Sequence, residues 1–598
     1  HGHGPSLSLS PSLNSLPPSL SVVRRLPALC LSPPPPLSRF PLSHFLSRQK
    51  SQPAMALPRR RHHLLNLLRR PFSTCPRKEK LLGSSPPSSP SSPSSLSSSS
   101  PPGPPELPLV GSIPWLFPWN GDPSVSMLEV YRGNYDRYMS EGAGIYHMGL
   151  PGLGEGSSGR VYVIADPREY LQVIQNEGKF PSGILEALWP LSERLKRQEQ
   201  TTNIFERGEG WKRERSFIQR NLLAPDVAKG YIPGIVEAAR LASRGAGDWG
   251  DQFNIFTARA SFDLFNAAFF GKLARTADAK NSQADPRDMQ FCDNVLRGFD
   301  LMVPILLSPS EKFIIDTLGL STSRFDKFCD FFNRAQDRVT EMIDDFMRSR
   351  ERGELQDWEK TSYCFSTLDY YEKECSDMNL EDIKTLFFGL LTAAVDTTSG
   401  VINWILVHLA LNPEVQDKLY AEMETQNFDI AKILLQRKEE VPYLHAIMRE
   451  SHRLSPTIQV SLMKNIDASI RLSGFYIPTG SKVLLDTYSM SNDPAIVPRP
   501  EEFLPERFLP DAVESRKGTR SEIIDHPLCS GPFSAGARKC PGSRVANYEI
   551  LTMISTLVTD WKITLDDPSI KCFKDVKYHY GTVCHPKPMP RLKLSPRT

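Results

Sequence analysis

The sequence is poor in cysteine and has no large excess of either charge. Ten cysteines in 598 residues form no dense framework, which argues against a small secreted domain held together by disulfides. The 71 basic and 68 acidic residues leave a formal net charge of +3, without the basic surplus that a chain-wide nucleic-acid binder uses against phosphate. No internal repeat is visible. Hydrophobic residues make up 40% of the chain, which is enough for a folded core and excludes a chain disordered throughout.

Acidic residues are missing from the first 78 positions, which carry 12 basic residues. The rest of the chain then holds 59 basic against 68 acidic residues, a net charge of −9. The first methionine is Met55, and residues 1–54 are rich in Ser, Leu and Pro. We interpret 1–54 as an upstream extension and leave open whether translation starts at His1 or Met55.

Residues 55–80 are rich in Arg and Leu and contain no acid before Glu79. This composition is typical of a transit peptide, and the density of Arg favours a mitochondrion over a plastid, which stays the alternative. A disordered basic tail is a second alternative. A secretory signal fits poorly, because the apolar core between Leu64 and Leu68 is too short.

Residues 84–105 consist of Ser and Pro, except for Leu96 and Gly103. Such a stretch has no side chains with which to build a core, so it predicts a flexible or polyproline-like linker. No second stretch of this kind follows. We therefore expect a disordered linker over 81–100 and one large folded domain over 101–598.

One apolar stretch, LFFGLLTAAVDTTSGVINWILVHLAL at 386–411, is a candidate membrane span. A charged Asp396 at its centre would be costly in a bilayer, so a long buried helix of a soluble protein is the preferred interpretation. Asn379 offers an N-cap, and Asn412 with Pro413 offers a stop. These signals predict a helix of about 32 residues, roughly 48 Å long at 1.5 Å per residue.

The most specific segment is GPFSAGARKCPGSRVANYEI at 531–550. Two glycines let the backbone approach a flat ligand closely, and an arginine can pair with an anionic group. The cysteine is free to bind a metal as a thiolate, which a nearby arginine and the start of a helix both favour. Five fixed positions in ten residues make an ordinary buried cysteine a poor explanation: Phe533, Gly536, Arg538, Cys540 and Gly542.

This segment resembles the haem-binding loop of the cytochrome P-450 family. The resemblance implies that Cys540 is the axial thiolate ligand of the iron in haem b, and that the thiolate promotes cleavage of the O–O bond. It also implies a mainly α fold with smaller β-sheets and a long central helix over the haem. In this fold the helix expected at 380–411 is the central one.

A second segment, Ala393–Thr398 in that helix, resembles the family's oxygen-activation segment. Activation of O2 needs protons inside an otherwise dry pocket, and the resemblance implies that Asp396 passes them inward while the Thr397 hydroxyl assists at the oxygen. Mid-helix Thr commonly bonds back to its own helix instead. Ala394 stands where the family usually has Gly, so a local opening of the helix is expected to be smaller.

Trp211 and Arg215 are four residues apart and share one helix face. They match the family's W-x-x-x-R, in which both groups bind a haem propionate, and Arg538 is a second propionate partner by the same resemblance. In the family a third cationic residue often binds a propionate as well, and Lys464 is its nearest equivalent here in a loose alignment. The alternative for Trp211 is ordinary core packing.

Glu450 and Arg453 form an E-x-x-R pair on one helix face, with Arg507 downstream in PERF. In the family these residues form a structural clamp behind the haem, and we expect them to hold the fold without taking part in chemistry. The order Trp211, Asp396, Glu450, Arg507, Cys540 is also the family's order.

The Arg-rich presequence and the Ser/Pro linker stand where microsomal members carry an apolar anchor, which resembles the mitochondrial branch. That branch receives electrons from an acidic ferredoxin that a flavoprotein reduces. Its two basic contact residues fall on His445 and Arg449, although a histidine is only partly charged at neutral pH. A solvated helix face is the alternative. Peripheral contact with a membrane is left open, and no nucleic acid is expected.

We therefore expect a haem-thiolate monooxygenase that inserts one oxygen atom of O2 into a hydrophobic molecule, sterol-like or fatty-acid-like. Its contacts would come from segments such as 180–200 and 295–320. A haem-thiolate isomerase or peroxide-rearranging enzyme is the alternative. A zinc-binding structural protein is a distant one, based on residues crowded near the C-terminus: His526, Cys529, Cys540, Cys572, His579, Cys584 and His585.

Overall fold

A computed structural model describes most of the chain from residue 100 onward. The described ranges are 100–107, 111–116, 127–150, 159–181, 188–199, 208–278, 283–306, 308–374, 378–458, 462–529, 531–580 and 583–597. The expected upstream extension, the transit peptide and nearly all of the linker lie outside the described residues.

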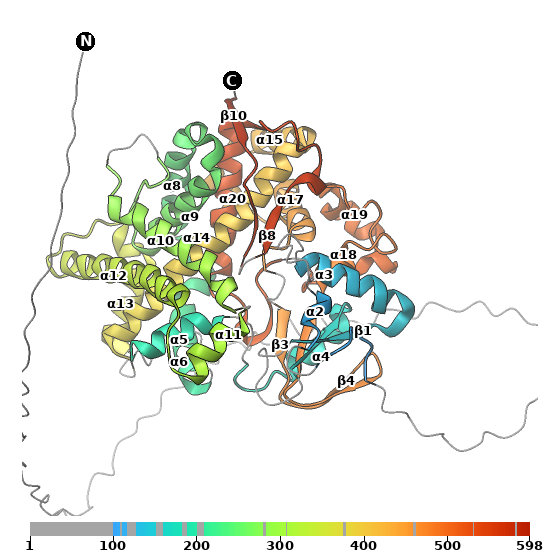
Figure 1. Cartoon of the computed structure of the whole chain (residues 1–598). Coiled ribbons are helices and arrows are strands. Elements are labelled where there is room, and N and C mark those ends of the chain that lie inside the picture. The colour runs from blue at the N-terminus through green and yellow to red at the C-terminus, as the bar shows by residue number, and fades with distance from the viewer. Residues whose placement is uncertain are drawn as a thin grey trace, which may run out of the picture. The chain divides into compact units, whose positions relative to one another are not determined.

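Helices make up most of the described chain, which confirms the predicted mainly α class (Figure 1). The α-helices are α2 Ile113–Leu116, α3 Met127–Asn134, α4 Pro167–Gln175, α5 Trp189–Arg197, α6 Gly208–Leu223, α7 Pro225–Lys229, α8 Ile232–Gly245, α9 Phe253–Phe269, α10 Pro286–Leu306, α11 Pro309–Lys312, α12 Ser323–Glu351, α13 Tyr363–Glu374, α14 Leu380–Leu411, α15 Pro413–Thr425, α16 Ile430–Leu435, α17 Pro442–Leu454, α18 Thr487–Ser491, α19 Pro510–Ser515 and α20 Ser543–Asp560. Short π-helical or 3-10 turns are η1 Tyr135–Ala143, η3 Ala246–Asp248, η4 Gly250–Gln252, η5 Phe313–Thr317, η6 Glu359–Thr361, η8 Pro505–Phe508, η9 Arg520–Asp525, η10 Gly536–Arg538 and η11 Phe573–Asp575.

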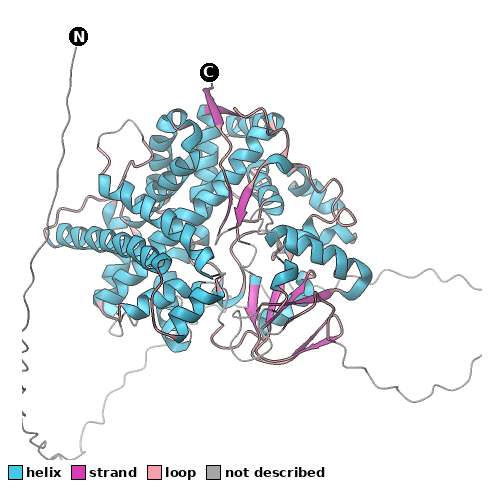
Figure 2. Cartoon of the chain, viewed as in Figure 1, coloured by secondary structure: helices cyan, strands magenta, loops and turns pink. Residues whose placement is uncertain are grey.

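The strands form small sheets, most of them on one side of the helices (Figure 2). They are β1 Ile145–Gly149, β2 Arg160–Ile164, β3 Met463–Asn465, β4 Ile470–Leu472, β5 Phe475–Ile477, β6 Lys482–Leu485, β7 Trp561–Leu565, β8 Tyr578–Tyr580, β9 Cys584–Pro586 and β10 Leu592–Pro596. The largest sheet has the order β1-β2-β6-β3, in which β2 and β6 are parallel and the other pairs antiparallel. Antiparallel pairs β4–β5, β7–β10 and β8–β9 complete the described sheets.

The long helix α14 lies at the centre of the helical part and begins and ends where the sequence predicts (Figure 1). Asn379 and Asp382 form a reciprocal capping box at its start, and Asn412 with Pro413 ends it. Helices α9, α12 and α20 pack around it. Among the described residues, α14 alone is long and apolar enough to cross a membrane, yet 72% of its apolar window is buried inside the protein. That burial agrees with the preferred interpretation of a core helix.

The main hydrophobic core lies between α14 and the helices around it. Phe269 on α9 packs edge-on against Phe387 on α14, with ring centroids 4.8 Å apart. Both rings are buried, and each such side chain contributes about 1.5–3 kcal/mol through the apolar surface it removes from water. This packing fixes α14 as a rigid element along which polar groups can be positioned.

Candidate active site

Cys540 lies in a loop that leads from η10 into α20. Its backbone N–H donates to the Phe533 carbonyl at 3.0 Å, which closes the loop. Gly536 has a φ of +74°, and a Cβ there would lie 2.2 Å from Glu177 Oε1, so no other residue fits without displacing that carboxylate. Gly542 caps α20, and a Cβ there would lie at an ordinary 4.0 Å from the Cys540 sulfur.

Two cationic side chains meet the Cys540 loop close to α6. Trp211 and Arg215 lie one turn apart on that helix, and Arg215 donates to the carbonyl of Lys539, the residue before Cys540. The Arg538 guanidinium lies 4.0 Å from the centroid of the Trp211 ring, a cation over an aromatic face. Burial lowers the pKa of Arg215, and the group stays protonated as arginines in proteins do.

Lys464 on β3 is the third cation at this loop, and it is almost completely buried. Its ammonium donates to the Ala535 carbonyl at 2.8 Å and lies 3.3 Å from Glu177 Oε2. Burial lowers the pKa of Lys464, and the Glu177 carboxylate opposes that shift. Glu177 was not found from the sequence.

The charge around the loop suits a flat ligand with two carboxylates. Arg215, Arg538 and Lys464 bring three positive charges to this loop, and Lys464 pairs with the carboxylate of Glu177. Haem b carries two propionates, and a thiol for its iron lies in the same loop. The residues present therefore fit that cofactor.

The Cys540 thiol is under opposing influences. Burial raises its pKa, whereas a hydrogen bond from the Gly542 N–H and the charges of Arg215 and Lys539 lower it. The opposing groups are those that the sequence analysis expected to favour a thiolate, namely a helix start and nearby cations.

One face of α14 stays accessible in the middle of an otherwise buried helix. Its accessible residues are spaced along one side, and most are small: Gly389, Ala393, Ala394, Thr397 and Val401. The Thr397 hydroxyl donates to the Ala393 carbonyl one turn earlier, at 2.8 Å. A hydroxyl that donates to its own helix keeps its lone pairs for a donor on the open side.

Asp396, the residue before Thr397, points away from that face. It is 6% exposed, and its Oδ1 lies 3.0 Å from Nε2 of His585 on β9. Gly400 allows this approach, because a Cβ there would lie 2.7 Å from Val583 Cγ1 and 3.1 Å from His585 Cε1. The sequence analysis placed His585 only in the zinc alternative and missed it as the partner of Asp396.

The zinc alternative gains no support from the described residues. Among them, no group of three or more His, Cys, Asp or Glu side chains is close enough to hold a metal ion.

Thr398 joins α14 to the helix that follows Cys540. Its hydroxyl lies 3.4 Å from Glu549 Oε2 on α20, and burial raises the pKa of Glu549 to about 8. Glu549 is thus a neutral acid at pH 7. The sequence analysis missed it, although a carboxyl nine residues after Cys540 on an expected apolar helix was a usable signal.

The predicted clamp forms, and it is buried. Arg453 donates to both carboxylate oxygens of Glu450 at 2.8 Å, and Arg507 Nε donates to Glu450 Oε1 at 3.1 Å. Glu450 is fully buried and Arg453 is 4% exposed. Arg453 and Arg507 also donate to backbone carbonyls between Ser491 and Glu502, so the clamp ties α17 to the segment before η8.

The two residues expected to receive a redox partner lie on the outer side of α17. Burial, together with the charge of exposed Lys438, lowers the pKa of His445 to about 4, so its imidazole is neutral at pH 7. Arg449 keeps its charge, lies 3.3 Å from Asp525 Oδ1 and covers the Phe508 ring. Its side chain is 24% exposed.

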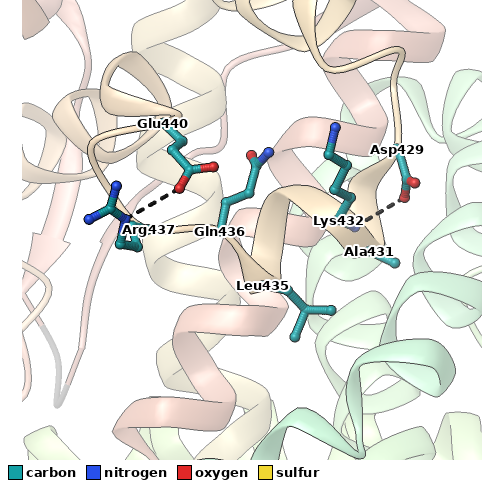
Figure 3. Close-up of a pocket in the computed structure, with 7 residues that line it drawn as sticks. All are labelled: Asp429, Ala431, Lys432, Leu435, Gln436, Arg437 and Glu440. Carbon is teal, nitrogen blue, oxygen red and sulfur yellow. Dashed lines mark hydrogen bonds and ion pairs between the residues drawn. The ribbon is translucent and has the colours of Figure 1, made fainter.

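A separate hollow of about 680 Å³ lies around α16, far along the chain from Cys540 (Figure 3). Charged tips of both signs line it, and Arg437 pairs with Glu440 across one turn at 3.4 Å. None of its lining residues belongs to the Cys540 loop or to the open face of α14. The hollow is therefore not part of the candidate active site.

Comparison with known proteins gives consistent matches. The family model for Cytochrome P450 matches residues 101–590. The mitochondrial cholesterol side-chain cleavage enzyme of Capra hircus is 26% identical over 419 residues, which cover 68% of this chain and 75% of the relative. Cytochrome P450 10 of Lymnaea stagnalis is 23% identical over 501 residues, 82% and 84% of the two chains. The mitochondrial sterol 26-hydroxylase of Rattus norvegicus is 33% identical over 187 residues, 30% and 33% of the two chains.

Proposed function

The chain belongs to the cytochrome P450 family, and on that premise we propose that it is a mitochondrial monooxygenase acting on a sterol-like or fatty-acid-like molecule with electrons from a ferredoxin. The family binds haem b through a cysteine thiolate, and its members related to this chain are monooxygenases. Beyond membership of the family, we propose a substrate class, an electron donor, a location in the mitochondrion and roles for individual residues.

Cys540 is the proposed thiolate ligand of the haem iron, and the bound haem supplies the activation of O2. Arg215, Arg538 and Lys464 are the proposed partners of the two propionates. Trp211 holds the Arg538 guanidinium over its ring and thereby positions it. Phe533 and the two glycines, Gly536 and Gly542, shape the loop so that its backbone can approach the flat ligand.

Asp396 and Thr397 are the proposed proton-handling pair. The Asp396 carboxyl is nearly buried, so water does not reach it freely from the open face of α14. The Thr397 hydroxyl donates to the Ala393 carbonyl, so its lone pairs are available to accept a hydrogen bond and relay a proton on the open face. Ala394 lies near Thr397 on α14, and an alanine there favours a regular helix more than the glycine that the family usually has at this position.

The observation that carries this proposal is the contrast between neighbours on α14. Thr397 borders the open face, whereas Thr398 is 2% exposed and faces Glu549. A hydroxyl that handles protons at the substrate must border the open face, and a structural hydroxyl need not.

Thr397→Ala should still bind haem and substrate, because Cys540 and the pocket walls are unchanged. Product formed per reductant consumed should fall, with peroxide released instead, since positioned acid–base groups contribute about 10²–10⁴-fold. Thr398→Ala is the matched control and should keep most of the parent's ratio. An unchanged ratio in Thr397→Ala would remove this residue from the mechanism and favour the isomerase alternative.

The remaining parts of the proposal rest on the relatives and on charge. Relatives named as cholesterol- and sterol-oxidising enzymes support a sterol-like substrate. Residues 55–80 are the proposed mitochondrial targeting segment, and residues 101–598 the haem-thiolate domain. Arg449, with exposed Lys438 near His445, is the proposed contact for an acidic ferredoxin.

A further inference from the structure

Asp396, the neighbour of Thr397 on α14, pairs with His585, whose ring is partly exposed at the surface of the protein. Asp396 belongs to α14, and His585 belongs to the β8–β9 hairpin near the C-terminus, which packs against α14 (Figure 1). The carboxylate side chain is 8% exposed and the imidazole 24% exposed. A half-buried histidine thus stands between a buried carboxyl group and solvent.

The surroundings of His585 leave it one close acidic partner and an open side. The β8–β9 register sets His579 opposite His585, and His579 is exposed. Lys587 pairs with Asp300 on α10 at 2.8 Å on the surface, and exposed Lys577 lies beside Lys587, whose backbone N–H donates to the Lys577 carbonyl. Asp396 is the group within hydrogen-bond distance of the His585 ring.

We propose that His585 relays protons from solvent to Asp396, so that the β8–β9 hairpin is part of the proton path into the active site. This inference rests on the proposed function, in which Asp396 supplies protons at Thr397. His585 acts through Asp396 and is therefore a positioning and relay residue.

The step balances in protons and charge. Nδ1 of the neutral ring takes a proton from a hydronium ion, which leaves as water, and Nε2 then gives its own proton to the Asp396 carboxylate across the 3.0 Å contact. The ring is left as its other tautomer, and exchange with water restores it because the ring is partly exposed. Histidine is the side chain whose charge changes near neutral pH, so no other residue type at 585 would serve equally.

The test uses the full-length, haem-loaded protein and His585→Gln. The glutamine amide can still donate to Asp396 but cannot pass a proton on. Turnover should fall about 10-fold or more, because the path for protons to Asp396 is interrupted. Lys587→Gln, two residues along the chain, is the matched control for the hairpin and should behave like the parent. An unchanged rate in His585→Gln would overturn the inference.

A second readout does not depend on activity. In the carbon monoxide complex with 15N-labelled histidine, the ring signal of His585 is assigned by its loss in His585→Gln. That signal should move in Asp396→Asn, and its ring N–H should exchange with water much faster than that of His408, which is fully buried. Exchange as slow as that of His408 would overturn the relay.

The double variant separates this inference from the proposed function. Asp396→Asn combined with His585→Gln should be no slower than Asp396→Asn alone, because both changes block one path. Additive losses would mean that His585 acts elsewhere. If Asp396→Asn itself leaves turnover unchanged, the proposed role of Asp396 fails. If Asp396→Asn slows turnover while His585→Gln does not, only the relay fails.

Discussion

The clamp of Glu450, Arg453 and Arg507 differs from the open face of α14 in how many hydrogen bonds hold its polar groups. Arg453 donates to both oxygens of Glu450 and to several backbone carbonyls, and these contacts are buried or partly buried. Thr397 makes one hydrogen bond that the structure records, to its own helix at Ala393. The polar groups of the clamp are held by hydrogen bonds within the protein. The Thr397 hydroxyl on the open face of α14 can still accept a hydrogen bond from a ligand or take part in proton transfer.

This difference predicts two kinds of response to mutation. Removing a partner from the clamp leaves a buried charge unpaired, which costs stability. Removing a group from the open face leaves the fold intact and changes what happens to protons.

Cys540→Ala should have the largest effect, because it removes the soft anionic ligand in the loop. The purified variant should lack the red-shifted carbon monoxide band that marks a thiolate-bound haem. Circular dichroism should show that the helices remain, since the loop is closed by the backbone bond to Phe533. A thiolate-type spectrum in this variant would mean that another cysteine is the ligand.

Glu450→Gln should cost about 3–5 kcal/mol of unfolding free energy, because it leaves the buried guanidinium of Arg453 without its counter-charge. Urea unfolding of the haem-loaded protein measures this. Glu440→Gln is the matched control, since Glu440 and Arg437 have the same spacing on the surface. That change should cost less than about 1 kcal/mol. Similar losses in both variants would contradict the description of the clamp.

Local signals predicted both regions well. The bounds of α14 follow from Asn379 and from Asn412 with Pro413, because caps and stops act on neighbouring residues. The spacing between Glu450 and Arg453 likewise predicts their pairing, since residues three apart share a helix face. Where a contact joins residues close in sequence, the sequence was sufficient.

The partners that the sequence missed come from distant segments. His585 lies 189 residues beyond Asp396, and Glu549 lies 151 residues beyond Thr398. Only the packing of the β8–β9 hairpin and of α20 on α14 brings them together, and no spacing rule covers such contacts. The motif thus identified Asp396, and the fold was needed to find what Asp396 touches.

His408, at the end of α14, ties the helix to the clamp and should make stability depend on pH. Burial lowers its pKa to about 3, while Nε2 lies 2.8 Å from Ser455 Oγ beyond α17. The unfolded chain takes up this proton near pH 6.5 and the folded chain only near 3. The stabilisation is therefore complete above pH 6.5 and is lost on acidification, by up to about 1.4 kcal/mol per pH unit.

His408→Gln should remove that dependence. The parent's advantage over the variant in urea unfolding should shrink by roughly 2 kcal/mol between pH 7.5 and 5. An advantage that stays constant over this range would mean that His408 is protonated in the folded protein, and that the end of α14 is less dry than its burial indicates.

Arg449→Glu should have the smallest effect on the protein itself and should test whether the outer side of the clamp helix also has a function. Arg449 is partly exposed, so reversing its charge should weaken an acidic electron donor more than it disturbs the fold. Ferredoxin-driven turnover should fall by roughly tenfold at low salt, and by less at high salt, where exposed charges are screened. Peroxide-driven turnover should stay near that of the parent, because it needs no partner.

Asp525→Asn is the matched control, since it loosens the same ion pair and leaves the charge of Arg449 in place. If Arg449→Glu lowers both kinds of turnover equally, or if Asp525→Asn reproduces its loss, Arg449 has only a structural role through its ion pair with Asp525. The proposed functional surface would then be limited to the open face of α14.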